Sequence, residues 1–179
     1  QPLIFEELTW KEIEGLERKN TIVFLPVGPL EEHGPHLPVG TDMYGAKDIA
    51  RMAAEMVVRK APGLKTVLMP AIPVGCCGVT EDFPGTVSLR GKTMYLLLAD
   101  ILTSLAQQGF LYLVVSNHHS DAVHMKALLT AIEEVEKTYP VGILETGSRI
   151  VYSGLEMEQI ARGTAMGLEM EKEVHGDVK

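Results

Sequence analysis

Residues 29–42, with the sequence PLEEHGPHLPVGTD, bring three carboxylates and two imidazoles into one short segment that contains three prolines. Carboxylate oxygens and imidazole nitrogens are ligands that divalent metals such as zinc and manganese accept. Successive side chains of an extended segment point to opposite sides, so Glu31 and His33 are expected to face one way and Glu32 the other. This segment predicts part of a metal site.

A second group of the same kind, NHHSD, occupies residues 117–121. Each group directly follows an apolar run of strand length. In a parallel α/β sheet the carboxyl ends of the strands lie at one edge, and sites form in the loops there. The two groups are therefore expected to meet in one shared metal site.

The elements that must position these groups alternate between strand-like and helix-like patterns. Thr9 and Glu12 form a capping-box pattern at a helix start. Residues 42–60 carry apolar side chains at helical spacing, among them Ile49, Met52 and Met56. We expect helices at 9–19, 42–60, 91–108, 121–139 and 155–170, and strands at 21–27, 66–74, 111–116 and 141–145. This alternation predicts an α/β fold, a mostly parallel sheet with helices on both faces.

Composition bounds the remaining possibilities. The chain has 179 residues, a net charge of −8 and 46% hydrophobic residues, which fits one globular domain and argues against nucleic acid or anionic membrane partners. No apolar run reaches membrane-spanning length and no secretory signal is visible. The two cysteines, Cys76 and Cys77, are adjacent and are interpreted as small residues of a glycine-rich loop, so a reducing, cytoplasmic location is expected.

The runs VGPLEEHGPHLPVGTD, FPGT and LYLVVSNHHSD, in this order and spacing, resemble the creatininase (creatinine amidohydrolase) family. The resemblance implies a three-layer α/β/α sandwich, two divalent ions (zinc, manganese or iron) and a homo-oligomer, usually a hexamer. Glu31, His33 and Asp42 would be metal ligands, with Asp42 bridging the ions, and His119 would complete the first ion's shell. Asp121 lies where creatininase has a ligating glutamate and is a candidate for the second ion.

Such a site predicts amide chemistry. A water shared by two ions loses its proton near neutral pH and can attack a carbonyl that the same ions polarise. We expect hydrolysis of a non-peptide C–N bond in a small cyclic amide, lactam or formamide. One alternative is a metal-binding relative without catalytic activity. A nucleotide-binding domain is disfavoured, because no glycine-rich phosphate loop follows the first strand.

Several positions depart from the family pattern. Creatininase places tryptophans near its flat substrate, but the only tryptophan here is Trp10, so creatinine itself is not the expected substrate. Thr80 stands where many relatives have a histidine. Relatives read NGHGGN around the metal-binding histidine, so His118 replaces a glycine. His118 and His124 are expected to be structural or exposed.

Two further side chains of the first segment have alternative roles. Glu32 is expected to be solvated or to lie behind the ligands, with direct metal contact as the lesser alternative. His36 is expected to hydrogen-bond loop backbone rather than to take part in chemistry.

The family's C-terminal catalytic motif is the last departure. Residues 1–179 are expected to form a single domain that lacks the family's C-terminal segment, which leaves the completeness of the second metal site open. The final residues read EVHGDVK. His175 is the candidate acid/base if His-Gly matches the creatininase motif, and Lys179 takes that position in the other register.

Overall fold

A central sheet of five parallel strands organises residues 1–147, the part of the chain that the computed structural model describes. The strand order is β1-β3-β2-β4-β5. The strands are β1 Leu3–Ile4, β2 Thr21–Val27, β3 Lys65–Leu68, β4 Tyr112–Asn117 and β5 Gly142–Glu145. Because β2 lies between β3 and β4, segments far apart in the sequence end side by side at the same edge.

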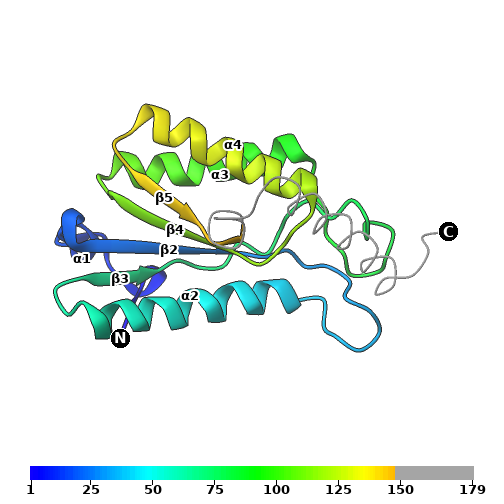
Figure 1. The fold of residues 1–179 in the computed structure, drawn as a ribbon, viewed down its shortest axis with the longest axis horizontal. Coiled ribbons are helices and arrows are strands. Elements are labelled where there is room, and N and C mark those ends of the chain that lie inside the picture. Colours follow the sequence, from blue (N-terminus) through cyan, green and yellow to red (C-terminus); the bar gives the residue numbers. More distant parts are fainter. Residues whose placement is uncertain (148–179) are drawn as a thin grey trace, which may run out of the picture.

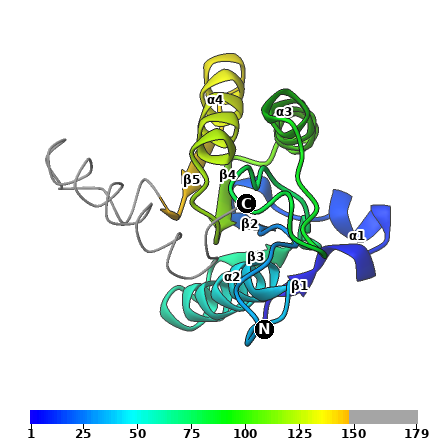
Figure 2. The same ribbon diagram turned by 90° about the vertical axis from the view of Figure 1, so that its right-hand side faces the viewer.

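Helices cover both faces of this sheet. Between residues 1 and 147 the α-helices are α1 Trp10–Glu14, α2 Thr41–Lys60, α3 Gly91–Gln107 and α4 Ala122–Thr138. Helices α3 and α4 pack side by side on one face, and α2 lies along the other (Figure 1; Figure 2). The predicted three-layer α/β/α sandwich is confirmed. Within residues 1–147 no helix is long and apolar enough to cross a membrane.

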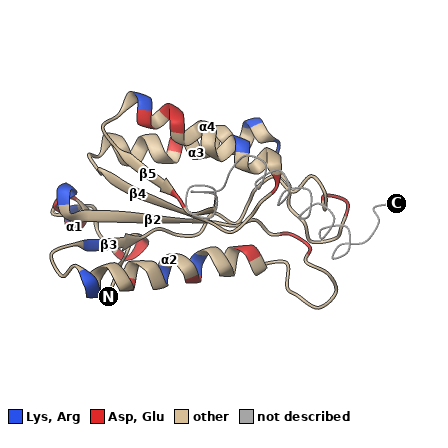
Figure 3. Ribbon diagram, in the orientation of Figure 1, with Lys and Arg blue, Asp and Glu red and all other residues tan. Residues whose placement is uncertain are grey.

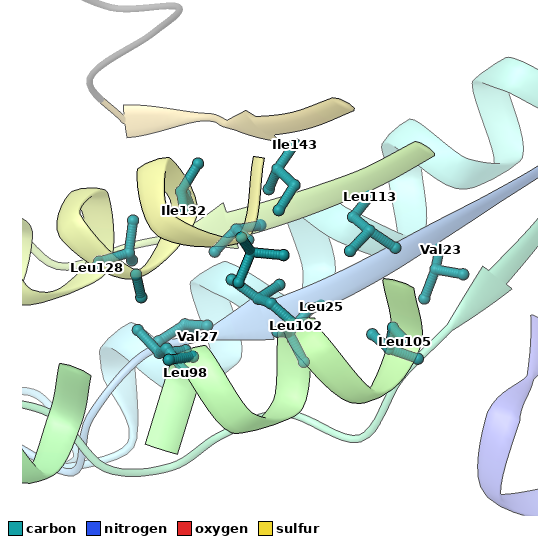
Figure 4. Packing of buried hydrophobic residues seen from close by; sticks show 14 of the residues in the cluster. Val23, Leu25, Val27, Leu98, Leu102, Leu105, Leu113, Leu128, Ile132 and Ile143 are labelled. Atoms are coloured by element: carbon teal, nitrogen blue, oxygen red, sulfur yellow. The ribbon is translucent and has the colours of Figure 1, made fainter. Parts of the chain in front are cut away.

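The larger core lies between the sheet and the α3–α4 pair. Figure 4 shows alternate residues of β2, Val23, Leu25 and Val27, directed at leucines of both helices. Leu98, Leu102 and Leu105 recur at the spacing that places side chains on one helical face, and all three are buried. The alternate side chains of β2 and the apolar face of α3 therefore pack together in one layer.

Helix α2 is where its residues were predicted, but it buries a different stripe. Ala46, Ala50 and Ala54 face the sheet, whereas Met52 and Met56 are 58% and 45% exposed. Small side chains let the helix approach Phe24 and Leu68 closely, so the smaller core on this face is built on alanine.

Helix α1 and strand β3 are shorter than predicted, and one short strand was not predicted. Helix α1 begins with the predicted capping box of Thr9 and Glu12 but ends at Glu14. Strand β3 ends at Leu68, before Pro70, because proline cannot donate to a strand ladder. Strand β1, only two residues long, was not predicted. The helix predicted at 155–170 lies outside the described residues.

Three connections converge beyond the carboxyl ends of the strands. They follow β2, β3 and β4, at the right of Figure 1 and toward the viewer in Figure 2. The connection after β3 folds back over the one after β2, through hydrogen bonds from Leu30 N to Pro73 O and from Val87 N to Leu30 O. This end of the sheet holds both groups of metal-binding residue types.

Candidate metal centre

The connection after β2 places Glu31 and His33 on one side, as predicted. The backbone N–H of Glu31 donates to Val39 O at 2.9 Å, which closes the loop on itself. Gly34, at φ 77°, supplies the left-handed conformation of the turn. Nδ1 of His33 donates to the carbonyl of Glu31 at 3.0 Å, which turns Nε2 toward Asp42 as the nitrogen that could bind a metal.

Asp42 lies buried in the first turn of α2, and its two carboxylate oxygens face different histidines. Oδ2 is 2.9 Å from Nδ1 of His119. Oδ1 is 3.1 Å from Nε2 of His33 and 3.3 Å from Nδ1 of His118. A carboxylate in this arrangement can bind one cation on each side.

His119, just beyond β4, joins the two carboxylates. Its Nδ1 also lies 3.1 Å from Oε2 of Glu31, while Nε2 donates to the carbonyl of Cys76 at 2.7 Å. A metal-binding histidine characteristically donates its other ring N–H to a carbonyl or carboxylate, which fixes the ring. Glu31, Asp42 and His119 thus converge from two strand ends, as the sequence predicted.

Two residues of the connection after β3, Thr80 and Cys77, also lie beside Glu31. The hydroxyl of Thr80 donates to Oε1 of Glu31 at 2.6 Å. Ligand atoms of Glu31, Cys77 and His119 lie within 4.8 Å of one another, as do those of Glu31, His33 and Asp42. Sequence reasoning treated Cys77 as a small loop residue, and no local pattern marked either side chain as a neighbour of Glu31.

Asp121 is not brought into these two groups. It caps the N-terminus of α4: Oδ1 accepts from the backbone N–H groups of Val123 and His124 at 2.8 and 2.9 Å. Its Oδ2 accepts from Gly78 N at 3.2 Å. Its predicted role as a metal ligand stays a prediction.

The remaining histidines divide as follows. His124 is buried, with Nδ1 accepting from Cys76 N and Nε2 donating to Asn117, and is structural as expected. His118 is 42% exposed yet contacts Asp42. His36 is exposed. His175 and Lys179 lie outside the described residues.

Glu32 does not share the orientation of Glu31. Its carboxylate accepts a hydrogen bond from the backbone N–H of Gly34 within its own loop. The side chain is partly buried.

The electrostatics of the cluster favour a bound cation. Burial alone would raise the pKa of Asp42, but hydrogen bonds from His118 and His119 outweigh it and lower the pKa to about 2. Burial would lower the pKa of His119, but Asp42, Cys77 and Glu31 together raise it well above its ordinary value. Two buried carboxylates therefore stay ionised at neutral pH, and without metal the protonated His119 compensates one of their two charges.

The surrounding loops add no competing cation. Residues 28–46, 69–89 and 118–125 contain no Lys or Arg, but they contain the carboxylates Glu31, Glu32, Asp42, Glu81, Asp82 and Asp121. Figure 3 shows acidic segments among these loops, with most Lys and Arg elsewhere on the ribbon. The donor set of oxygen, imidazole nitrogen and one nearby thiol fits zinc, manganese or iron.

Fold and site together define a three-layer α/β domain with a candidate metal centre at the carboxyl ends of its parallel strands. The family model described as "Creatininase: Creatinine amidohydrolase" matches residues 6–178. The chain belongs to the creatininase family.

Individual relatives agree with this. The creatinine amidohydrolase of Pseudomonas putida is 34% identical over 119 residues, 63% of this chain and 43% of that protein. A mycofactocin precursor peptide peptidase of Mycolicibacterium smegmatis is 35% identical over 115 residues, 64% of this chain and 46% of that protein. A solved structure described as "Creatininase Mn" has a TM-score of 0.66 and 27% identity, covering 81% of this chain and 58% of that one. The matches span about half the length of these relatives.

Proposed function

We propose that this chain is part or all of a metal-dependent hydrolase that cleaves a C–N bond with the help of two divalent ions. The observation that carries this proposal is the position of Asp42, whose two oxygens face different imidazoles at 2.9 to 3.3 Å. Ionised carboxylates can bridge two cations, whereas a neutral imidazole cannot. The similarity to a creatininase structure whose name includes manganese supports the choice of ion class.

The ligand set follows from the two sides of Asp42. Glu31, Asp42 and His119 would hold the first ion, and His33 with Asp42 would hold the second. Divalent ions held here would supply an activated water as nucleophile and would polarise the carbonyl under attack. Backbone carbonyls of Glu31 and Cys76 keep the two ring nitrogens turned toward the carboxylates.

A proton must reach the leaving nitrogen as the C–N bond breaks. We assign this step to His175, with Lys179 as the alternative. The readout is kcat in the His175→Ala and Lys179→Ala variants at unchanged metal content. An unchanged kcat in His175→Ala would contradict the assignment.

The substrate class we propose is a small non-peptide amide, such as a cyclic amide, lactam or formamide. The name of the Pseudomonas relative supports an amide. Trp10, the only tryptophan of the chain, is 68% exposed at the start of α1, so it offers creatinine no stacking surface beside the cluster. Peptide cleavage is the second candidate, favoured by the 35% identity to a peptide peptidase.

We propose a homo-oligomer in the cytoplasm with a small molecule as its partner. Sedimentation of the purified chain would test the oligomer.

Metal analysis tests the proposal directly. Protein purified without added metal or chelator should contain about two divalent ions per chain. Asp42→Ala should lose both ions. Asp48→Ala removes a carboxylate of the same helix whose side chain is 68% exposed, and it should retain them.

The outcomes separate the alternatives. Absence of metal after soaking in zinc and manganese, or unchanged metal content in Asp42→Ala, would overturn the proposal. Two ions without turnover of amides, formamides or peptides would favour the inactive metal-binding relative.

A further inference from the structure

His118 occupies a position that the proposed ligand set does not yet use. Its Nδ1 lies 3.3 Å from Oδ1 of Asp42, the same oxygen that His33 approaches at 3.1 Å. The first ion's ligands are all on the Oδ2 side of Asp42, with His119. His118 and His33 therefore both approach the oxygen that would bind the second ion.

The distances fit shared coordination. Metal–nitrogen and metal–oxygen bonds of about 2.1 Å at angles near 90° to 110° separate two ligand atoms by about 3.0 to 3.4 Å. The separations of 3.3 Å for His118 and 3.1 Å for His33 from Asp42 Oδ1 lie within this range. An ion beside Oδ1 could reach either nitrogen with little movement of the side chain.

Helix α2 leaves space for the His118 ring at one position. A Cβ atom on Gly45 would lie 2.9 Å from three carbons of the ring, closer than real contacts allow. The backbone N–H of His118 donates to Val27 O at 3.1 Å, which anchors the residue to the end of β2. Gly45 therefore leaves room for the His118 ring, and the hydrogen bond to Val27 holds the backbone of His118 at the end of the sheet.

The competing ligand for the second ion is already engaged. Both oxygens of Asp121 accept backbone hydrogen bonds, from Val123 and His124 on one side and from Gly78 on the other. Coordination through Oδ1 would compete with the cap of α4, and coordination through Oδ2 would compete with the hydrogen bond from Gly78.

We propose that His118 is a ligand of the second ion, together with His33 and Asp42, and that Asp121 serves as the cap of α4. This inference rests on the proposed function, since it names a ligand of the same metal centre. The side chain of His118 is 42% exposed. If His118 binds the second ion, that ion would lie on the solvent side of the site.

Metal content per chain tests the assignment without an activity assay. His118→Ala should retain the first ion and lose the second, so that the content falls from about two ions to about one, with the dissociation constant of the second ion raised more than about a hundredfold. Gly45→Ala should weaken the same ion by displacing the ring, while alanine favours the helix. His36→Ala removes an exposed histidine of the neighbouring loop and should keep both ions.

Asp121→Asn tests the competing assignment, in which Asp121 binds the second ion. It should keep both ions, because asparagine can still cap the helix. Loss of one ion in Asp121→Asn, or two ions retained in both His118→Ala and Gly45→Ala, would overturn the assignment and leave the metal-dependent hydrolase intact. A wild-type chain that binds no ion would overturn the proposed function itself.

Discussion

Thr80 and Glu31, 49 residues apart, are joined by a 2.6 Å hydrogen bond in which the threonine hydroxyl donates to Oε1. This bond attaches the connection after β3 to the end of β2. The other oxygen of Glu31, Oε2, faces His119. Thr80 therefore orients a carboxylate without occupying the side that faces the other ligands.

Replacing Thr80 by valine should weaken metal binding about tenfold, the lower range for the loss of a group that orients a ligand. Burial alone would raise the pKa of Glu31, whereas hydrogen bonds from His119 and Thr80 lower it, so removing one donor raises the pKa and favours the proton over the ion. Competition with a chromophoric chelator measures the affinity. Thr80→Ser should bind as the wild type does, and equal affinities of the valine and serine variants would contradict the role.

Gly28→Ala should destabilise the protein by about 3 kcal/mol, the upper range for inserting a group into a packed interior. A Cβ atom at Gly28 would lie 2.4 Å from the carbonyl oxygen of Asp42 and 2.7 Å from Met43 N, which are backbone atoms that cannot turn away. Urea denaturation measures the loss. Gly63→Ala is the matched control, because nothing lies within 4 Å of its Cβ position, and it should be neutral or slightly stabilising. Equal midpoints for the two variants would refute this prediction.

The unfolding free energy of the metal-free protein should fall as pH decreases from 6.5 to 4. Burial lowers the pKa of His124 to about 4, so the unfolded chain binds a proton at His124 below pH 6.5, while the folded chain resists it. This contribution is present above pH 6.5 and amounts to about 3 kcal/mol, at 1.36 kcal/mol per pKa unit. Denaturation at several pH values in the presence of chelator measures the slope.

His124→Asn isolates this effect. The variant should show a flatter slope over the same interval, whatever its absolute stability. Glu31 and Asp42 have lowered pKa values, so they lose their contributions only below about their ordinary values of 4.5 and 3.8. An unchanged slope in His124→Asn would assign the dependence to other groups.

The two thiols should react slowly with a disulfide reagent in the native protein. Cys76 and Cys77 are both buried, and burial raises the pKa of each thiol, which lowers the fraction of reactive thiolate. Release of the chromophore should be slow in buffer and rapid in denaturant. Fast reaction of the native protein, assigned with Cys76→Ser and Cys77→Ser, would contradict the buried position.

Much of the fold could be predicted because its elements are marked locally. The apolar, β-branched run of 21–27 coincides with β2, and the Thr9–Glu12 capping box is present in the structure. Strand β1 has only two residues and depends on its pairing with β3, so no local pattern reveals it. The alanine stripe of α2 was missed, because alanine adds little hydrophobic signal and its value there is close approach to the sheet.

The site was predictable where residue type and strand ends agree, as for Glu31, His33, Asp42 and His119. The proximity of Thr80 and Cys77 to Glu31 was not predictable, because only the path of the connection after β3 brings them there. Asp121 illustrates a different difficulty. Its sequence position fits both a helix cap and a metal ligand, because one carboxylate can serve either role.

The parallel order of the strands also has a consequence for how the chain folds. His119 and Asp42, 77 residues apart, can meet only after β2 has paired with β4. Such long-range pairing is slow to form, so the complete ligand set for the ions exists only in the folded domain. Their binding then adds to the stability of the whole domain by mass action, and its thermal midpoint should rise with the concentration of free metal in the medium.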